Sequence, residues 1–252
     1  MSFTSLRAVI FDLDGTIYCG DHPMAGAQEL LQFLSERGTL VFFGTNNSTR
    51  TRQQISAKLN GMALPATPER VYSAAYLAAR YLRENRCREV YCFGSQGLAE
   101  ELKLQGVATV ATPEDATVLL IGLDTGLDYQ RISTLLPLRD KPCRLVACNR
   151  DKFFPSDQGK PQLGCGFVVR VVEEALGRSV DYVVGKPNPY LLDLVLSEHG
   201  LAKDEVLVIG DSRESDVGMA QAAGCRFLHL STEKGAGLSH VNSLTEVRSI
   251  LS

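Results

Sequence analysis

Acidic, amide and basic side chains follow four apolar segments of the sequence, at the points where buried strands would end. "FDLDGT" follows the first segment, "GTNNST" the second, "GKPNP" the third and "GDSRESD" the fourth. Parallel sheets covered by helices bind ligands at the carboxyl ends of their strands, so these four segments are expected to converge if their strands are neighbours. The converging side chains would be those of Asp12, Asp14, Thr45, Asn46, Lys186, Asp211 and Asp216.

The charges of this set predict a metal ion and a phosphate. Three carboxylates held close together repel one another and resist ionisation, and a hard divalent cation with oxygen ligands removes this cost. Thr45 and Asn46 offer a hydroxyl, an amide and backbone N–H groups, and Lys186 offers a positive charge. The sequence therefore predicts Mg²⁺ as the cofactor and a phosphate monoester as the ligand.

The two aspartates nearest the first strand fit different steps of phosphoryl transfer. Asp12 lies next to the strand end and is expected to attack phosphorus, which gives an aspartyl-phosphate. Asp14, in the same turn, is expected to protonate the leaving oxygen and then deprotonate the hydrolytic water. Gly15 allows the sharp turn, and Lys186 with the metal would neutralise charge on the transferring group.

Each segment taken alone also has a purely structural interpretation. "DLDGT" is compatible with an Asp-Gly turn, and "TNNS" with the N-cap of a helix. "GKPNP" is compatible with a loop before a proline-started helix, and in "GDSRESD" either Ser215 or Asp216 could cap a helix. The occurrence of all four segments in this order, each after a strand, favours the functional interpretation.

The elements that must position these residues alternate along the chain. Apolar runs predict strands at 7–11, 40–44, 89–94, 117–123, 144–149, 181–185, 205–211 and 226–230. Helix-period stretches lie between and after them, at 26–38, 51–61, 73–85, 96–106, 128–136, 167–177, 189–200, 215–224 and 243–251. This alternation predicts an α/β protein with a Rossmann-like parallel-sheet core and helices on both faces.

Composition and charge indicate which partners and which cellular compartment to expect. The 252 residues carry a net charge of −3, which gives no reason to expect a nucleic acid polymer as partner. No apolar run approaches the roughly 18 residues that span a bilayer, and no signal-peptide pattern opens the chain, so no membrane is expected. Seven cysteines without a C-x-x-C pair indicate free thiols, and we expect a cytoplasmic protein. Homo-oligomerisation is left open.

The four segments together resemble the four motifs of the haloacid dehalogenase (HAD) superfamily. "FDLDGT", the Thr of "FGTNNS", the lysine of "VVGKPNP" and the acidic "GDSRESD" occur in that family's order over the whole chain. "FGTNNS" and "VVGKPNP" resemble the NagD-like subfamily, which includes 4-nitrophenylphosphatase-type enzymes. An aspartate at position 14 is what the resemblance implies for phosphoryl chemistry rather than dehalogenation.

The resemblance also implies a role for each site residue. Asp12 would be the nucleophile and Asp14 the acid/base, while Thr45, Asn46 and Lys186 would bind phosphate. The metal would be held by Asp12, Asp211 and the backbone carbonyl of Asp14. Supporting roles would fall to Gly15, Ser212 and Asp216.

The spacing of the motifs predicts an inserted domain. Thr45 and Lys186 are separated by far more chain than one crossover connection needs. We expect a discontinuous catalytic core at 1–82 and 180–252, and an inserted α/β cap domain at 83–179, which the resemblance implies is a C2-type cap. Within it, Asn149, Asp151 and Lys152 of "CNRDKFFP" either contact the leaving group or form an Asx turn.

The sequence thus predicts a Mg²⁺-dependent phosphatase that hydrolyses small phosphate monoesters and whose partner is a small phosphorylated metabolite. Two alternatives remain open. One is a phosphotransferase or phosphomutase, in which a sugar hydroxyl replaces water. The other is a module that binds a phosphate ligand without turnover, which the intact set of acids and lysine disfavours.

Overall fold

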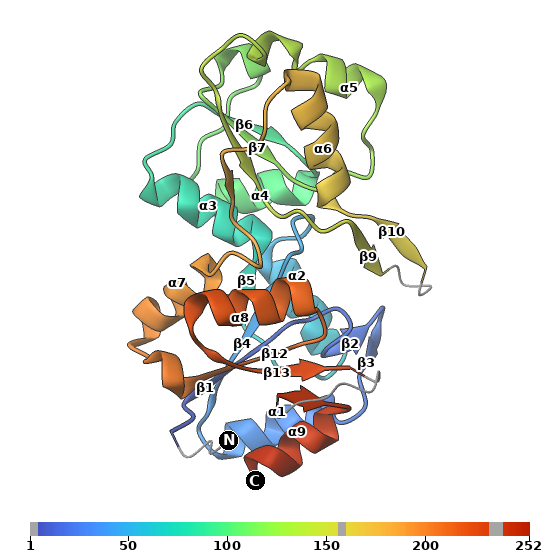
Figure 1. Cartoon of the computed structure of the whole chain (residues 1–252), viewed down its shortest axis with the longest axis vertical. Helices are drawn as coiled ribbons and strands as arrows, with labels where there is room; N and C mark the ends of the chain where they lie inside the picture. Colours follow the sequence, from blue (N-terminus) through green and yellow to red (C-terminus); the bar gives the residue numbers. More distant parts are fainter. Residues whose placement is uncertain (1–4, 156–159, 232–238) are drawn as a thin grey trace.

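The computed structural model describes residues 5–155, 160–231 and 239–252, which form two lobes stacked along the long axis of Figure 1. The larger lobe, which contains both chain termini in that view, is built on a parallel sheet of six strands. Their order across the sheet is β14 (His240–Val241), β13 (Arg226–Leu230), β12 (Val206–Gly210), β1 (Ala8–Phe11), β4 (Leu40–Thr45) and β5 (Val71–Ser73).

Alternation of side chains along the central strand explains why both faces of this sheet are covered. Val9 and Phe11 belong to the hydrophobic cluster formed with helices α1 (Ala27–Glu36), α2 (Arg52–Gly61) and α9 (Leu244–Leu251). Ala8 and Ile10 belong to the cluster formed with α7 (Tyr190–His199) and α8 (Gly218–Ala223). Successive residues of a strand point to opposite faces, so one four-residue apolar run supplies two cores.

The smaller lobe has its own parallel sheet. Its order is β11 (Tyr182–Val183), β8 (Arg144–Ala147), β7 (Val118–Ile121) and β6 (Val90–Phe93). Helices α4 (Gln96–Leu104), α5 (Tyr129–Ser133) and α6 (Cys165–Leu176) belong to this lobe. Two antiparallel hairpins complete the fold: β2 (Tyr18–Cys19) with β3 (His22–Pro23), and β9 (Phe153–Pro155) with β10 (Pro161–Leu163). Figure 1 shows the second hairpin projecting from the smaller lobe beside the gap between the lobes.

One predicted strand lies in the other sheet. The predicted domain bounds assign the strand at 181–185 to the catalytic core, together with the strands that end in the other three motifs. Its observed part, β11, instead pairs in parallel with β8, with Tyr182 opposite Val146 and Val183 opposite Ala147. The division into core and inserted cap stays a proposal, and this pairing moves its second proposed boundary from residue 180 to a point after Val183.

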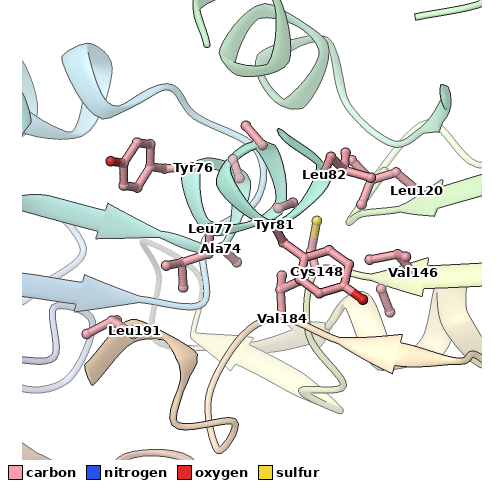
Figure 2. Close-up of a cluster of buried hydrophobic side chains, with 14 of the residues drawn as sticks. Ala74, Tyr76, Leu77, Tyr81, Leu82, Leu120, Val146, Cys148, Val184 and Leu191 are labelled. Carbon is pink, nitrogen blue, oxygen red and sulfur yellow. The ribbon is translucent and has the colours of Figure 1, made fainter. Parts of the chain in front are cut away.

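A continuous hydrophobic cluster joins the lobes through helix α3 (Ala74–Glu84), which follows β5 directly. Figure 2 shows Leu77 and Tyr81 of this helix among apolar side chains from both lobes. Val146 and Leu120 come from the smaller sheet, and Leu191 comes from α7 of the larger lobe. Eight of the eleven residues of α3 are buried, so the helix is packed on several sides and serves both cores.

The predicted α/β class is confirmed, and the predicted helices and longer strands are present with shifted ends. The strands missing from the prediction have two or three residues each: β2, β3, β5, β9, β10 and β14. Such segments are too short to show a hydrophobic period, so tertiary pairing rather than local pattern defines them. None of the helices within the three described ranges is long and apolar enough to cross a membrane.

Close contact between the lobes generates a prediction about Gly97 of α4. A β-carbon at this position would overlap the backbone carbonyl of Thr49 in the larger lobe. We expect Gly97→Ala to reduce the free energy of unfolding by about 1 to 3 kcal/mol, because backbone on both sides must shift. Thermal or urea denaturation measures this.

Gly61→Ala is the matched control, because Gly61 is also helical but faces open space. It should be neutral or stabilising by up to about 1 kcal/mol. Equal destabilisation by the two substitutions would contradict the close approach of the lobes at Gly97.

Candidate active site

A cleft of about 1150 Å³ is lined by residues of both lobes. Its lining includes Asp12, Asp14 and Lys186 from the motif segments and Asp151 and Phe153 from the smaller lobe. The carboxyl ends of β1, β4 and β12 open into it, as expected for a ligand site in a parallel sheet. Although β11 belongs to the other sheet, Lys186 still reaches the same place.

Lys186 forms the centre of the charged cluster. Its Nζ donates to Oδ1 of Asp12 at 2.5 Å, to Oδ1 of Asp216 at 2.6 Å and to the backbone carbonyl of Gly44 at 2.9 Å. The Lys186 side chain is only 3% exposed. An ammonium group donates three hydrogen bonds, so these three acceptors satisfy it completely.

Burial and charge act in opposite directions on this cluster. Burial raises the pKa of Asp12 well above its usual value, although Lys186 opposes the shift. For Lys186, burial disfavours the charged form, but the carboxylates of Asp12 and Asp216 outweigh it and raise its pKa. The lysine therefore stays charged at neutral pH, and it is the group that favours an ionised Asp12.

The turn after β1 depends on Gly15. This residue has φ of +88°, and a β-carbon on it would lie 2.5 Å from Oδ2 of Asp211. A side chain at position 15 would therefore force a strained backbone conformation and would collide with Asp211, which follows β12. Thr16 adds a link between the two loops, because its hydroxyl donates to Oδ1 of Asp211 at 3.2 Å.

Three carboxylates are close enough to share a cation. Oxygens of Asp12, Asp211 and Asp216 lie within 4.8 Å of one another. Asp216 is 1% exposed and already accepts from Lys186 and from the backbone N–H of Ser212. Asp211 is exposed to the cleft, but the surrounding protein still removes part of the water around its carboxylate. This desolvation raises its pKa, and the charge of Asp216 adds to the shift. Asp12 and Asp211 thus have the chemistry of metal ligands, while Asp216 holds the lysine and its own loop.

Asp14 is held by a residue that the sequence analysis did not identify. Tyr18, four residues further along the chain, donates its hydroxyl to Oδ2 of Asp14 at 3.1 Å. Burial raises the pKa of Asp14, and the Tyr18 hydrogen bond opposes the shift. No sequence period predicts this contact, because it arises from the tight turn at Gly15.

Thr45 and Asn46 lie at the end of β4, as predicted, but the Asn46 amide is already engaged. Its Nδ2 donates to both carboxylate oxygens of Asp151, at 3.1 and 2.9 Å, and to the carbonyl of Lys186 at 3.1 Å. Its Oδ1 accepts from the backbone N–H of Lys186 at 2.9 Å. Asn46 therefore links the lobes through its side chain. A contact with phosphate through its backbone N–H stays a prediction.

The segment at 149–151 forms the Asx turn, which is one of the two interpretations offered for it. Asn149 forms the predicted Asx turn, since its Oδ1 accepts from the backbone N–H of Asp151 at 3.0 Å. Its Nδ2 also donates to the backbone carbonyl of Asn46 at 2.7 Å. Burial raises the pKa of Asp151. Both side chains line the cleft, and whether they touch a leaving group stays a prediction.

Two of the structural interpretations do not hold. The N-cap of α2 is Thr51, which forms a capping box with Gln54, so "TNNS" does not cap that helix. In the last motif the cap is Ser212, whose hydroxyl accepts from the backbone N–H of Ser215 in the π-helical turn η5 (Arg213–Val217). Neither Ser215 nor Asp216 performs that role.

Two family models match the chain. One is described as haloacid dehalogenase-like hydrolase and matches residues 9–108; the other, described as HAD-hydrolase-like, matches residues 183–243. Most of the smaller lobe, from residue 109 to residue 182, lies between the two matches. They include all four motif segments.

Individual proteins agree with the family models. The chain is 31% identical over 246 residues to human glycerol-3-phosphate phosphatase, covering 86% of this chain and 76% of the relative. It is 34% identical over 224 residues to mouse chronophin, covering 84% and 76%. The crystal structure of a 4-nitrophenylphosphatase from Thermotoga maritima superposes with a TM-score of 0.90 at 25% identity, covering 99% of each chain. The chain therefore belongs to the haloacid dehalogenase-like hydrolases, within the phosphatase subfamily that contains the NagD-like and 4-nitrophenylphosphatase-type proteins.

Proposed function

We propose that the protein is a Mg²⁺-dependent phosphatase that hydrolyses small phosphate monoesters through an aspartyl-phosphate on Asp12. The single observation that carries the proposal is the ion pair between Lys186 and Asp12 in the cleft, at 2.5 Å. It places a buried positive charge beside the carboxylate that is expected to attack phosphorus. Such charge stabilises the transferring phosphoryl group in its transition state.

The first half of the reaction uses Asp12 and Asp14 together. Asp12 attacks phosphorus, the bond between phosphorus and the ester oxygen breaks, and the leaving oxygen takes a proton from Asp14. The raised pKa of Asp14, caused mainly by burial, supports this role because it favours the protonated form. Lys186 faces Asp12 and is suited to bind a phosphoryl oxygen as well.

The second half hydrolyses the intermediate. Asp14, now deprotonated, accepts a proton from a water molecule that attacks phosphorus and releases Asp12 as a carboxylate. When bound, Mg²⁺ would supply charge neutralisation between the acidic residues and the phosphoryl oxygens. Asp12 and Asp211 would hold it with side-chain oxygens. The backbone carbonyl of Asp14 would be a further ligand, as the family resemblance implies.

The size of the cleft and the names of the relatives indicate where to look for a substrate. A volume of about 1150 Å³ exceeds that of a phosphate group many times over and leaves room for a leaving group against the smaller lobe. Two relatives are named glycerol-3-phosphate phosphatase and phosphoglycolate phosphatase. We therefore propose small phosphorylated metabolites as substrates, and a panel of such esters is the first screen.

Removal of the nucleophile tests the chemistry. Asp12→Asn should lower kcat/KM for 4-nitrophenyl phosphate by at least about a thousandfold, because the amide cannot form the acyl-phosphate. EDTA should abolish wild-type turnover, and Mg²⁺ should restore it. Asp140→Asn, at an exposed position outside the cleft lining, is the matched control and should retain wild-type rates.

Three outcomes separate the alternatives. Wild-type turnover by Asp12→Asn would contradict the proposed nucleophile. Binding of phosphate esters by the metal-loaded wild type without any release of phosphate would favour the ligand-binding module. Turnover that requires an added sugar would favour the phosphotransferase.

The raised carboxyl pKa values predict how metal-free protein responds to pH. Burial raises the pKa of Asp12, Asp14 and Asp211 above the usual 3.8. At a pH between 3.8 and the raised pKa of each group, the folded state therefore binds more protons than the unfolded state. In EDTA, their contribution to the free energy of unfolding should therefore fall as pH rises through the folded pKa values. Mg²⁺ should offset this loss, so its stabilising effect should grow with pH. Thermal denaturation with EDTA or Mg²⁺, from about pH 4 to pH 8, measures both trends.

Asp211→Asn provides the comparison for this effect. The amide does not titrate and binds a cation weakly, so the pH slope in EDTA and the shift caused by Mg²⁺ should both shrink. Asp140→Asn should change neither. A stabilising effect of Mg²⁺ that is unchanged in Asp211→Asn would contradict the proposed metal site.

A further inference from the structure

The hydrogen bond between Tyr18 and Asp14 is part of a closed local structure. The backbone N–H of Gly15 donates to the carbonyl of Tyr18 at 2.8 Å, and the N–H of Tyr18 donates to the carbonyl of Leu13 at 3.2 Å. These bonds turn the chain back on itself, so the phenol returns to the carboxylate four residues earlier. Tyr18 is 5% exposed and sits at the start of the β2–β3 hairpin.

A side chain from a second element, α2, also contacts the ring. Nζ of Lys58, on α2, lies 4.4 Å from the centroid of the Tyr18 ring. The same ammonium group lies 3.4 Å from the carboxylate of Asp21, in the turn of the hairpin. Tyr18 is therefore held by its own backbone and by a cation–π contact, which leaves its hydroxyl little freedom except toward Asp14.

We propose that Tyr18 is a positioning residue that determines which oxygen of Asp14 carries the transferable proton. Tyr18 donates to Oδ2, so in the protonated acid Oδ2 is the acceptor oxygen and the proton resides on Oδ1. The acid would then present its proton from one defined oxygen rather than from either of two. Across the described ranges, Tyr18 is the one side-chain donor recorded for the Asp14 carboxylate.

The inference rests on the proposed function, because it assigns a role within the proton transfer from Asp14. That transfer matters most when the leaving oxygen is a strong base. An alkoxide must be protonated as it leaves, whereas 4-nitrophenolate leaves readily without a proton. A residue that orients the proton of Asp14 should therefore affect the two classes of ester unequally.

The test compares kcat/KM of Tyr18→Phe for glycerol 3-phosphate and for 4-nitrophenyl phosphate. This parameter covers the steps up to departure of the leaving group, so hydrolysis of the aspartyl-phosphate does not enter it. Phenylalanine keeps the ring beneath Lys58 and removes only the hydroxyl. We expect a loss of about tenfold for the alkyl ester and less than about twofold for the aryl ester.

Two further variants make the result specific. Tyr190→Phe removes a hydroxyl that donates to Glu84 outside the cleft lining, at 2.6 Å, and should affect both esters equally. Asp14→Asn should lose about a hundredfold or more on the alkyl ester and much less on the aryl ester. In the Asp14→Asn background, Tyr18→Phe should have no further effect on the alkyl ester, because the two residues act through one proton.

The outcomes distinguish the inference from the proposed function. If Asp14→Asn discriminates between the esters and Tyr18→Phe does not, the positioning role of Tyr18 is wrong while the proposed function stands. The positioning role is also wrong, and the proposed function still stands, if Tyr18→Phe lowers kcat/KM for the alkyl ester by the same factor with and without Asp14→Asn. If Asp14→Asn affects both esters equally, the acid role of Asp14 falls, and the role of Tyr18 falls with it.

Discussion

The site depends on one buried ion pair network, in which Lys186 lies between Asp12 and Asp216. Removing a charged group from water is costly, and the cost is recovered only when every hydrogen-bonding position is used. Lys186 meets this condition with two carboxylates and the carbonyl of Gly44. Asp216 balances its charge, and the backbone N–H of Ser212 anchors Asp216 in turn. The loops after β1 and β12 and the last part of strand β4 are thus tied to one ammonium group, that of Lys186, which follows the smaller lobe in the sequence.

The link between the lobes is polar near the site and apolar away from it. On the cleft side, the side chain of Asn46, in the loop after β4, forms hydrogen bonds with Asp151 and with the backbone of Lys186. One amide therefore links this loop to the smaller lobe and to the segment that carries the lysine. Behind it, Tyr81 of α3 stacks on Tyr182 of β11 with ring centroids 4.3 Å apart. The two chain segments that connect the lobes are therefore in direct contact. The position of the smaller lobe over Asp12 is coupled to the loop that is expected to bind phosphate.

Much of this architecture could be predicted from the sequence because its signals are local. Buried strands and amphipathic helices show their periods directly, and motif residues that follow strands must lie at one edge of a sheet. The prediction was wrong for β11, since an apolar run of a few residues does not reveal which of two parallel sheets it joins. It also missed the engagement of Asn46 with Asp151, which are 105 residues apart, and of Thr16 with Asp211, which are 195 apart. Contacts of this kind depend on side-chain geometry after folding, and no single-sequence pattern encodes them.

The position of α3 sets a rule for exchanging parts between relatives. Its buried residues complete the cores of both lobes, and β11 adds an edge strand to the smaller sheet after the last helix of that lobe. A chimera that replaces only the predicted insert, residues 83–179, would keep nearly all of α3 and the whole of β11 from the host, although both pack against the replaced lobe. Its new core would contain apolar surfaces selected for different partners. A graft that carries residues 74–184 as one unit keeps these contacts together, so the transferable module is larger than the inserted sequence alone suggests.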